Sequence, residues 1–439
     1  MEEHHNEKRS TFSGRLGFVL SAAGASVGLG NIWRFPYLAA KYGGGIFLLV
    51  YIVLALTFGY TMIVAETALG RMTKKSPVGA FARFGKSRWL SFGGWVIKYL
   101  VEYIKGNGKA LAGDGYFTSF ISNGTSTELC FLVFTFFTLA IIYAGVRNGV
   151  ERVSSMMMPV LVVLSVIIAV YSVTRPGALE GVKYFLVPNL SNFSWMTVVA
   201  AMGQMFYSLS IAMGILVTFG SYMKKDISIE DSTRNVEVFD TAIAIMAGLM
   251  IIPAVFAFSG GDPDTLQAGP SLMFITIPKV FASMGLGTFV GILFFLLVLC
   301  AAVTSSIALT ESAVSTFQDE LKWGRKKSTV VVGVIMVVLG TLSSLGYGPL
   351  GFVKIIGMQF LDFFDFLTNS VMMPIAAIAT CLLVSRVIGV KKIEQEVLAG
   401  EAKFRRKKIF NFMIRYLCPI FAAIILVSSV ANAFGWIKM

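Results

Sequence analysis

Long apolar runs recur along the chain of 439 residues, and short polar stretches separate them. A helix that crosses a bilayer needs about 20 mainly apolar residues. By this criterion the pattern predicts an all-α, polytopic membrane protein with eleven spans. Their expected limits are 14–38, 43–70, 89–105, 127–146, 152–174, 195–221, 239–259, 287–319, 327–346, 352–389 and 409–435.

Three stretches between the spans also have predictable structure. We expect a short interfacial helix at 176–186 and a helical hairpin at 270–284, both over the outer face. Residues 390–408 are expected to form an inner loop, with their charges on a solvated face.

The first span is interrupted by residues that an ordinary membrane helix avoids. Gly28 and Gly30 stand beside Asn31 and Arg34. Glycine weakens a helix by about 1 kcal/mol relative to alanine, and Asn or Arg is costly against lipid. Because unpaired backbone groups cannot face lipid, the pattern predicts a helix broken at mid-membrane, with its freed groups facing a cavity. The alternative is a glycine-rich packing face, since small residues line helix contacts in membranes.

The sixth span is interrupted in a similar way. Gln204, Ser208 and Ser210 lie inside an apolar run. Paired interrupted spans in corresponding halves are typical of transporter binding sites. Because these spans are five apart, we expect two inverted five-helix repeats and an extra span. The expected divisions are a cytoplasmic tail at 1–13, repeats at 14–174 and 175–389, and an inner loop with the last span at 390–439.

Composition and charge support a membrane location. The chain is 56% hydrophobic and only 14% charged, whereas soluble domains carry about 25% charge. The net charge of +13 could suggest nucleic acid. However, about 26 of the 37 Lys and Arg residues fall in the predicted inner loops, as the positive-inside rule describes. This bias predicts a multi-pass protein of the plasma membrane with a cytoplasmic amino terminus, surrounded by lipid and with no nucleic-acid partner.

The apolar segments lack the residues of hydrolytic and ATP-driven chemistry. The histidines, His4 and His5, both lie in the polar start of the chain, which excludes a His-based zinc site or a Ser-His-Asp triad in the membrane. The four cysteines form no CxxC pair and are interpreted as reduced core residues. No G-x-x-x-x-G-K-[ST] sequence is present, which argues against an ATP-driven pump of that type. We therefore predict that the protein is not an enzyme.

Six motifs resemble those of the neurotransmitter:sodium symporter family, whose members have the LeuT-type fold. The resemblance covers almost the whole chain and implies sodium-coupled symport by alternating access. Its motifs are GLGNIWRFPY at 28–37, GGGIFLLVY at 43–51, ETALGR at 66–71, GQMFYSLS at 203–210, PAVFAFSG at 253–260 and TSSIA at 304–308.

The resemblance implies two sodium sites and no organic cofactor. One sodium would bind the carbonyls of Gly24, Val27 and Ala301 and the hydroxyls of Thr304 and Ser305. Broken helices supply such carbonyls at their half-helix ends. The alternative for the two hydroxyls is a bond to a carbonyl of their own helix, which Ser and Thr form readily.

The second sodium would bind the Ser26 carbonyl, Asn31, Ser208 and Asp240. Asp240 is expected to open the seventh span, so a helix N-cap is the alternative role for its carboxylate. In the family, a carboxylate near this position accompanies chloride independence. The resemblance therefore implies transport without chloride.

The substrate site implied by the resemblance would bind a carboxylate at the N–H groups of Leu29 and Gly30. A half-helix amino terminus carries roughly half a positive charge. Amine-transporting relatives have an aspartate at the position of Gly28, so glycine implies an amino-acid substrate. The pocket would be Tyr207, Ser210, Met213, Ser305 and Leu309, which suits a neutral hydrophobic or aromatic side chain, although ordinary helix packing is the alternative role for Tyr207 and Met213.

Two charged pairs are expected to act as gates. Pairs of this kind break and form between states, and exposed pairs contribute only about 0–1 kcal/mol to static stability. The expected outer gate is Arg34 with Asp365, near Gln204, and the expected inner gate is Arg9 with Asp319, near Tyr222.

Three further features lie in or beside the membrane. The segment from Gly149 to Pro159 has the spacing of a stretch that unwinds in this family, and a simple proline kink is the alternative. Glu66 is interpreted as a structural hydrogen-bonding residue, and Glu311 receives no role.

The third span departs from the family pattern. Trp89 to Phe92 run directly into Gly93-Gly94-Trp95, and about 20 family residues are absent there, including a tyrosine that contacts the substrate carboxylate. The remainder is marginal as a span and includes Lys98 and Glu102. Either the third helix is truncated or re-entrant in a working transporter, or the chain is a degenerate, binding-only membrane protein.

Overall fold

The computed structural model describes residues 11–76, 86–260 and 271–437. Within these ranges the regular structure is helical, apart from two isolated bridges, Gly44 with Pro188 and Ile355 with Met358. The predicted all-α class is therefore confirmed. Segments labelled η are π-helical, except η5, which is a 3-10 helix.

The first half of the chain forms twelve described helical elements. They are α1 (Arg15–Ser26), η1 (Gly30–Arg34), α2 (Phe35–Lys41), α3 (Gly45–Leu54), η2 (Ala55–Gly59), α4 (Tyr60–Thr73), α5 (Lys86–Ile104), α6 (Gly108–Leu111), α7 (Tyr116–Ser122), α8 (Gly124–Tyr143), η4 (Val146–Glu151) and α9 (Arg152–Val173).

The second half contains the second broken helix and the longest spans. Its elements are α10 (Ala178–Leu186), η5 (Leu190–Asn192), α11 (Trp195–Ser208), α12 (Ile215–Tyr222), α13 (Ile229–Ser259), η7 (Leu272–Thr276), α14 (Ile277–Ala282), α15 (Gly287–Leu321), α16 (Arg325–Leu345), α17 (Phe360–Asp365), η8 (Phe366–Met372), α18 (Met373–Leu382), η9 (Leu383–Ile388), α19 (Val390–Leu398), α20 (Lys407–Phe412), η10 (Met413–Leu417) and α21 (Cys418–Ala433).

Among the described residues, eight helices are long and apolar enough to cross a membrane. The number rises to nine if the bent pair of α1 with η1–α2 is counted as one span. The two other expected spans correspond to α5 and to the interrupted pair α11 and α12. The multi-pass prediction is therefore confirmed. The eight helices are Gly45–Thr73, Gly124–Tyr143, Val146–Val173, Ile229–Ser259, Gly287–Leu321, Arg325–Leu345, Phe360–Ile388 and Lys407–Ala433.

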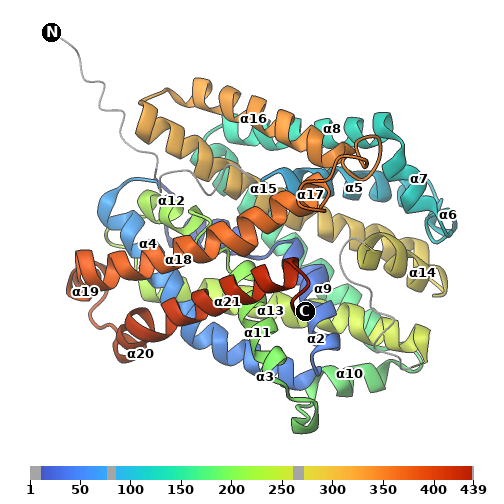
Figure 1. Cartoon of the computed structure of the whole chain (residues 1–439), viewed down its shortest axis with the longest axis horizontal. Coiled ribbons are helices and arrows are strands. Elements are labelled where there is room, and N and C mark those ends of the chain that lie inside the picture. The colour runs from blue at the N-terminus through green and yellow to red at the C-terminus, as the bar shows by residue number, and fades with distance from the viewer. Residues whose placement is uncertain (1–10, 77–85, 261–270, 438–439) are drawn as a thin grey trace.

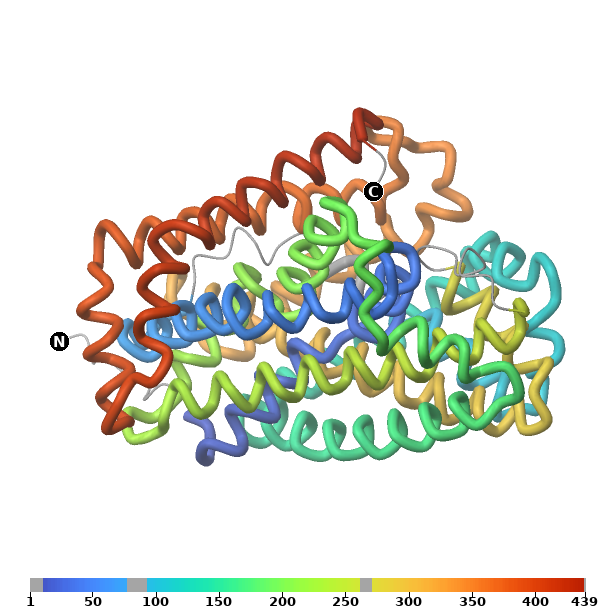
Figure 2. Tube along the Cα trace, turned by 90° about the horizontal axis from the view of Figure 1, so that it is seen from below, coloured from blue at the N-terminus to red at the C-terminus, as the bar shows by residue number. Residues whose placement is uncertain are grey.

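The long helices form a bundle in which most axes run roughly along one direction (Figures 1 and 2). One end carries α19 and α20, and we call it the α19 end. The opposite end carries α6, α7 and α14, and we call it the α14 end. Helices α18 and α21 pack together along one side, whereas α1 contacts α9, α13 and α15. The broken helix α1 therefore lies in the packed core.

The two stretches expected over the outer face have different outcomes. The first contains a helix as predicted, α10, Ala178–Leu186, and its interfacial position stays a prediction. The predicted hairpin at 270–284 is wrong, because its described residues form one helix, Leu272–Ala282. Pro278 lies inside this helix and cannot donate to the Phe274 carbonyl. That carbonyl accepts from the Tyr99 hydroxyl at 2.8 Å instead, so the helix continues through the proline.

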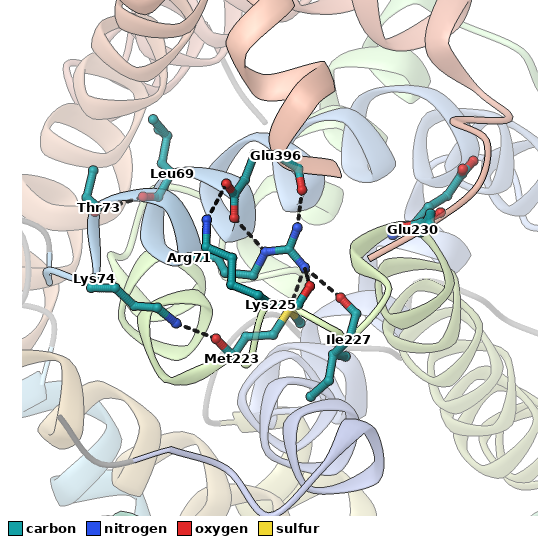
Figure 3. Close-up of polar contacts among 10 residues, drawn as sticks. Leu69, Arg71, Thr73, Lys74, Met223, Lys225, Ile227, Glu230 and Glu396 are labelled. Atoms are coloured by element: carbon teal, nitrogen blue, oxygen red, sulfur yellow. Dashed lines mark hydrogen bonds and ion pairs between the residues drawn. The ribbon is translucent and has the colours of Figure 1, made fainter. Parts of the chain in front are cut away.

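The loop after the tenth span folds onto the α19 end of α4 (Figure 3). Arg71 Nε lies 2.7 Å from Glu396 Oε1, and the guanidinium also donates to the carbonyls of Glu396 and Ile227. Lys225 Nζ lies 2.8 Å from the other carboxylate oxygen. Glu396 is 7% exposed and Arg71 is fully buried. The predicted solvated face is therefore wrong for Glu396, whose burial is tolerated because the charge is paired and hydrogen-bonded.

The third span is a continuous helix of 19 residues, α5, over its described length. At 1.5 Å per residue it is about 28 Å long, close to the thickness of a hydrocarbon core. A re-entrant turn is therefore wrong for residues 86–104. Gly93 and Gly94 allow it to pack closely against α8, since an added Cβ at Gly94 would lie 2.7 Å from the Phe131 nitrogen.

Candidate functional site

The first span is broken where the sequence predicts. α1 ends at Ser26, and Val27 leaves helical geometry with ψ 81°. The Gly28 N–H bonds back to the Ser26 carbonyl at 2.8 Å, and helical structure resumes at Gly30. The two halves are bent by 52°. Orphan carbonyls of α1 and orphan N–H groups of η1 therefore meet in the protein interior.

The second break separates α11 from α12. Ser210, Ala212 and Gly214 have positive φ angles of 53°, 60° and 78°. Such a run cannot continue a right-handed helix. The Ala212 N–H donates to Glu66 Oε1 at 2.7 Å, which confirms the structural role predicted for Glu66. The unwound backbone is thus held by a buried side chain from α4.

The two breaks lie directly against each other. The Ser210 hydroxyl donates to the Ala25 carbonyl at 3.1 Å, and the Gln204 amide donates to the Gly30 carbonyl at 3.1 Å. A Cβ added at Gly30 would lie 2.5 Å from the Tyr207 ring. Glycine is therefore needed at position 30 for this close approach, and the alternative of a simple packing face does not account for the polar contacts.

Three predicted sodium ligands form one buried cluster between the breaks. The Asn31 amide donates to Asp240 Oδ1 at 2.8 Å. The Ser208 hydroxyl lies 2.9 Å from Asn31 Oδ1 and 2.8 Å from Asp240 Oδ1. Tyr51 completes the cluster by donating to Asp240 Oδ2 at 2.9 Å. All four side chains are at most 1% exposed.

Asp240 lies in the middle of α13, and this corrects the sequence interpretation. The helix begins at Ile229, where the Ser228 hydroxyl accepts from the Asp231 N–H at 3.0 Å. An N-cap role for Asp240 is therefore wrong, as is the expected start of the span at residue 239. A carboxylate in a helix interior cannot cap the N–H groups of the first turn. Helix capping therefore does not explain why Asp240 is buried.

The chemistry of this cluster fits a small hard cation. In the described part of the chain, the side chains that contact the Asp240 carboxylate are the uncharged groups of Asn31, Ser208 and Tyr51. Burying a carboxylate without a countercharge is expensive. Carboxylate, amide, hydroxyl and carbonyl oxygens are the donors that hard cations prefer. The Ser26 carbonyl at the end of α1 would add a further oxygen in such a site.

The other predicted sodium ligands meet where α1 packs on α15. A Cβ added at Gly24 would lie 3.2 Å from Thr304 Cβ, so the two helices touch at this point. The Ser305 hydroxyl lies 3.4 Å from the Ala25 carbonyl. The Thr304 hydroxyl donates to the carbonyls of Cys300 and Ala301 at 3.0 and 3.1 Å. This is the bond to its own helix that the alternative interpretation expects. The oxygen lone pairs of the hydroxyl remain available to a cation.

We expect Thr304→Ala to raise the sodium concentration for half-maximal uptake by about 3- to 10-fold, the effect of one lost polar contact. Thr310→Ala is the matched control, because Thr310 also bonds to its own helix, with Ser306 at 2.7 Å. Sodium titration of uptake in proteoliposomes is the measurement. Equal shifts in both variants would show that Thr304 serves only its helix.

Most of the predicted substrate residues belong to the two broken helices, and Ser305 and Leu309 lie on α15. Leu29 and Gly30 stand at the start of η1, where the first N–H groups of a helix have no intrahelical partner. The surrounding side chains are all buried. They are Tyr207, Ser210, Met213, Ser305 and Leu309.

Two of the predicted outer-gate residues, Arg34 and Asp365, line one cavity of about 160 Å³. Gln204 does not line it and instead donates to the Gly30 carbonyl. Arg34 donates to the Gly203 carbonyl at 3.4 Å, and its guanidinium lies 5.1 Å from the centre of the Tyr207 ring. Asp365 accepts from the Asn369 amide at 2.5 Å on the other side. The structure thus places Arg34 and Asp365 on the walls of the same cavity.

The inner-gate prediction is only partly described. Arg9 lies outside the described residues, and Asp319 accepts from the backbone and hydroxyl of Ser76 at 2.7 and 2.6 Å. The Tyr222 hydroxyl donates to Glu311 at 2.7 Å. Tyr222 therefore contacts a carboxylate for which the sequence offered no role.

Glu311 is fully buried and bonds to Arg325, which lies 2.6 Å from its Oε2. Arg325 also donates to the Ile142 carbonyl of α8 at 2.6 Å. The pair therefore joins α8, α12, α15 and α16 near the α19 end. The sequence analysis did not assign partner roles to Arg325 and Tyr51, which contact Glu311 and Asp240. The available signal was a polar group at or inside a span, because such a group needs a hydrogen-bond partner when it is buried.

The segment from Gly149 to Pro159 is helical in this structure. η4 and α9 form one stretch, Val146–Val173. A Cβ at Gly149 would lie 2.0 Å from the Ile141 carbonyl, so glycine permits the tight connection after α8. Unwinding of this segment remains a prediction for another state.

Comparisons with known proteins identify the family and the fold. The profile of the Sodium:neurotransmitter symporter family matches residues 9–107 and 114–435. The uncharacterized sodium-dependent transporter YhdH of Bacillus subtilis is 34% identical, over 96% of this chain and 97% of the relative. An uncharacterized sodium-dependent transporter of Haemophilus influenzae is 30% identical, over 97% and 99%. The crystal structure of MhsT in complex with L-phenylalanine matches with a TM-score of 0.85 and 35% identity, over 96% of this chain and 100% of that one. The chain belongs to the sodium:neurotransmitter symporter family, which comprises sodium-dependent membrane transporters and not enzymes, and it has the LeuT-type fold.

Proposed function

We propose that the protein carries a neutral hydrophobic or aromatic amino acid together with sodium across the plasma membrane by alternating access. The observation that carries this proposal is the buried cluster of Asn31, Ser208 and Asp240 between two broken helices. A cation bound there would hold both breaks in one arrangement. Sodium binding would therefore favour the state that also binds substrate, as coupling requires.

Two sodium ions are proposed, one at Asp240 and one at Thr304. The substrate carboxylate would lie against the N–H groups of Leu29 and Gly30, and its side chain against Tyr207 and the other buried pocket residues. The complex of MhsT with L-phenylalanine supports this substrate class. Methionine in the pocket would let it adapt to several apolar side chains.

The proposed orientation places the amino terminus in the cytoplasm. The tail, residues 1–13, and the α19 end would then be inside, and the α14 end outside. The two proposed repeats are 14–174 and 175–389, and the last span follows from 390. Arg34 with Asp365 would gate the outer side, and Arg9 with Asp319, near Tyr222, the inner side.

We expect transport to need no chloride, because the Asp240 carboxylate provides the negative charge within the membrane. Asp240→Ser is expected to be weaker than the parent chain or to gain activity from chloride. Uptake in chloride-free gluconate buffer, compared with chloride buffer, is the measurement. Full activity of Asp240→Ser in gluconate would contradict this assignment.

A binding-only membrane protein is the second candidate function, and α5 is the reason. The Tyr99 hydroxyl donates to the Phe274 carbonyl at 2.8 Å, and Tyr103 lines a different cavity. Neither replaces the family tyrosine at the substrate carboxylate. Sodium-driven uptake of a panel of labelled amino acids into proteoliposomes separates the two functions. Binding of an amino acid with no uptake would favour the second.

A further inference from the structure

A cavity of about 330 Å³ lies at the α14 end, away from the sodium and substrate residues. It is formed where α5 and α6 meet the turn between α14 and α15. Its volume is at the lower end of the range for ligand pockets, about 300–1,000 Å³. Its walls include Tyr103, Lys109, Phe281 and residues 284–289.

One wall of this cavity is the amino terminus of α15, the longest described helix, with 35 residues. Its N-cap residue is Leu286, and no side chain caps the first turn. The N–H groups of Thr288 and Phe289 belong to that turn and have no intrahelical acceptor. Uncapped N–H groups and the positive end of a long helix attract an anion.

Tyr103 provides an independent indication of a ligand. Its ring is held between two glycines, since a Cβ at Gly291 or Gly108 would lie 2.2 or 3.0 Å from it. The side chain is 1% exposed, and its hydroxyl has no hydrogen-bond partner among the described residues. Buried hydroxyl groups are nearly always hydrogen-bonded. A polar ligand atom in the cavity would supply the partner.

The rest of the lining has both charge and apolar surface. Lys109 is exposed and adds a positive charge. Leu286 and Phe289 remain 59% and 57% exposed at the start of a membrane span. A ligand with an anionic head and apolar chains matches this combination better than a wholly soluble anion does, because a soluble anion would leave the apolar surface uncovered.

We propose that this cavity binds the phosphate group of an anionic membrane phospholipid. The phosphate would accept hydrogen bonds from the first turn of α15, from Thr288 and Tyr103, and would pair with Lys109. The acyl chains would lie along Leu286 and Phe289. This site is independent of the transported substrate, so it stands or falls separately from the proposed function.

Native mass spectrometry of the full chain, extracted from vesicles of equal phosphatidylglycerol and phosphatidylcholine, tests the proposal. The parent chain is expected to retain one phosphatidylglycerol in preference to phosphatidylcholine. Tyr103→Phe and Lys109→Gln should each weaken retention by roughly 3- to 10-fold. Gly285→Leu should abolish it, because Gly285 lines the cavity and has nothing within 4 Å of its Cβ position, so the new side chain can fill the space.

Two matched controls should behave as the parent chain. Gly324→Leu adds the same side chain where nothing lies within 4 Å, outside the cavity. Lys105→Gln removes a neighbouring lysine that pairs with Glu102 at 3.6 Å. Equal retention of the two lipids, or unchanged retention in Gly285→Leu, would overturn the proposal. Displacement of the lipid by millimolar glycerol phosphate or inorganic phosphate would assign the site to a soluble phosphate and overturn the lipid assignment.

Discussion

Asp240→Asn is expected to raise the sodium concentration for half-maximal uptake by at least tenfold while the fold is kept. Two unit charges 4 Å apart interact by about 4 kcal/mol at an effective dielectric constant of 20. Loss of even half of that weakens binding by more than tenfold. Asparagine has the same shape, and its carbonyl oxygen can still accept from Asn31 and Ser208. Its NH2 group would face the Tyr51 hydroxyl as a donor, so that one contact reverses direction. Sodium titration of amino-acid uptake is the measurement.

Two controls separate charge from packing in this experiment. Asp362→Asn neutralises a carboxylate outside the Asp240 cluster, which accepts from the Tyr347 hydroxyl at 2.8 Å, and should leave sodium dependence unchanged. Tyr51→Phe removes one hydrogen bond from Asp240 and keeps the charge, so a smaller shift is expected. An unchanged sodium requirement in Asp240→Asn would remove the cluster from the proposed sodium site.

Restoring about 20 apolar residues, with a tyrosine, before Gly93 is expected to strengthen amino-acid binding by roughly 10- to 100-fold. The tyrosine would donate a hydrogen bond to the substrate carboxylate, and hydrogen bonds to charged groups contribute about 1.5–3 kcal/mol. The parent chain should accordingly bind weakly. Equilibrium binding of labelled amino acids to both chains in sodium buffer is the measurement.

The same insertion with phenylalanine in place of tyrosine is the matched control. It restores helix length without the hydroxyl, so it should repair packing and not the hydrogen bond. The glycine contacts of α5 with α8 lie after the insertion point and are expected to persist. Sub-micromolar binding by the parent chain would show that another group has replaced the tyrosine.

The spans and the two breaks could be predicted because each depends on local sequence. Apolar runs of membrane length specify helices, and Gly28, Gly30, Asn31 and Ser208 interrupt those runs with groups that lipid excludes. The contacts between the breaks follow from this, since interrupted backbone must be buried against protein. Asn31, Ser208 and Asp240 do lie together.

Other features depend on partners that local sequence does not contain. The ten residues before Phe239 are mostly polar, so an apolar criterion placed the start of the seventh span too late, whereas α13 begins at Ile229. Glu311 and Glu396 have no local signal, because their partners, Arg325 and Arg71, come from other elements. Burial of a charge becomes intelligible only when its partner is known.

The buried pair of Arg71 and Glu396 has a consequence for biogenesis. The two residues are 325 positions apart. At a synthesis rate of about 5–20 residues per second, the ribosome needs roughly 15–65 s to deliver the second after the first. During that interval the guanidinium lacks its carboxylate partner, and the α19 end of α4 cannot reach its final packing. A late part of the chain, α19, therefore supplies the ion pair that fixes α4, an early helix. A nascent protein that ends before Val390 would lack the carboxylate partner of Arg71.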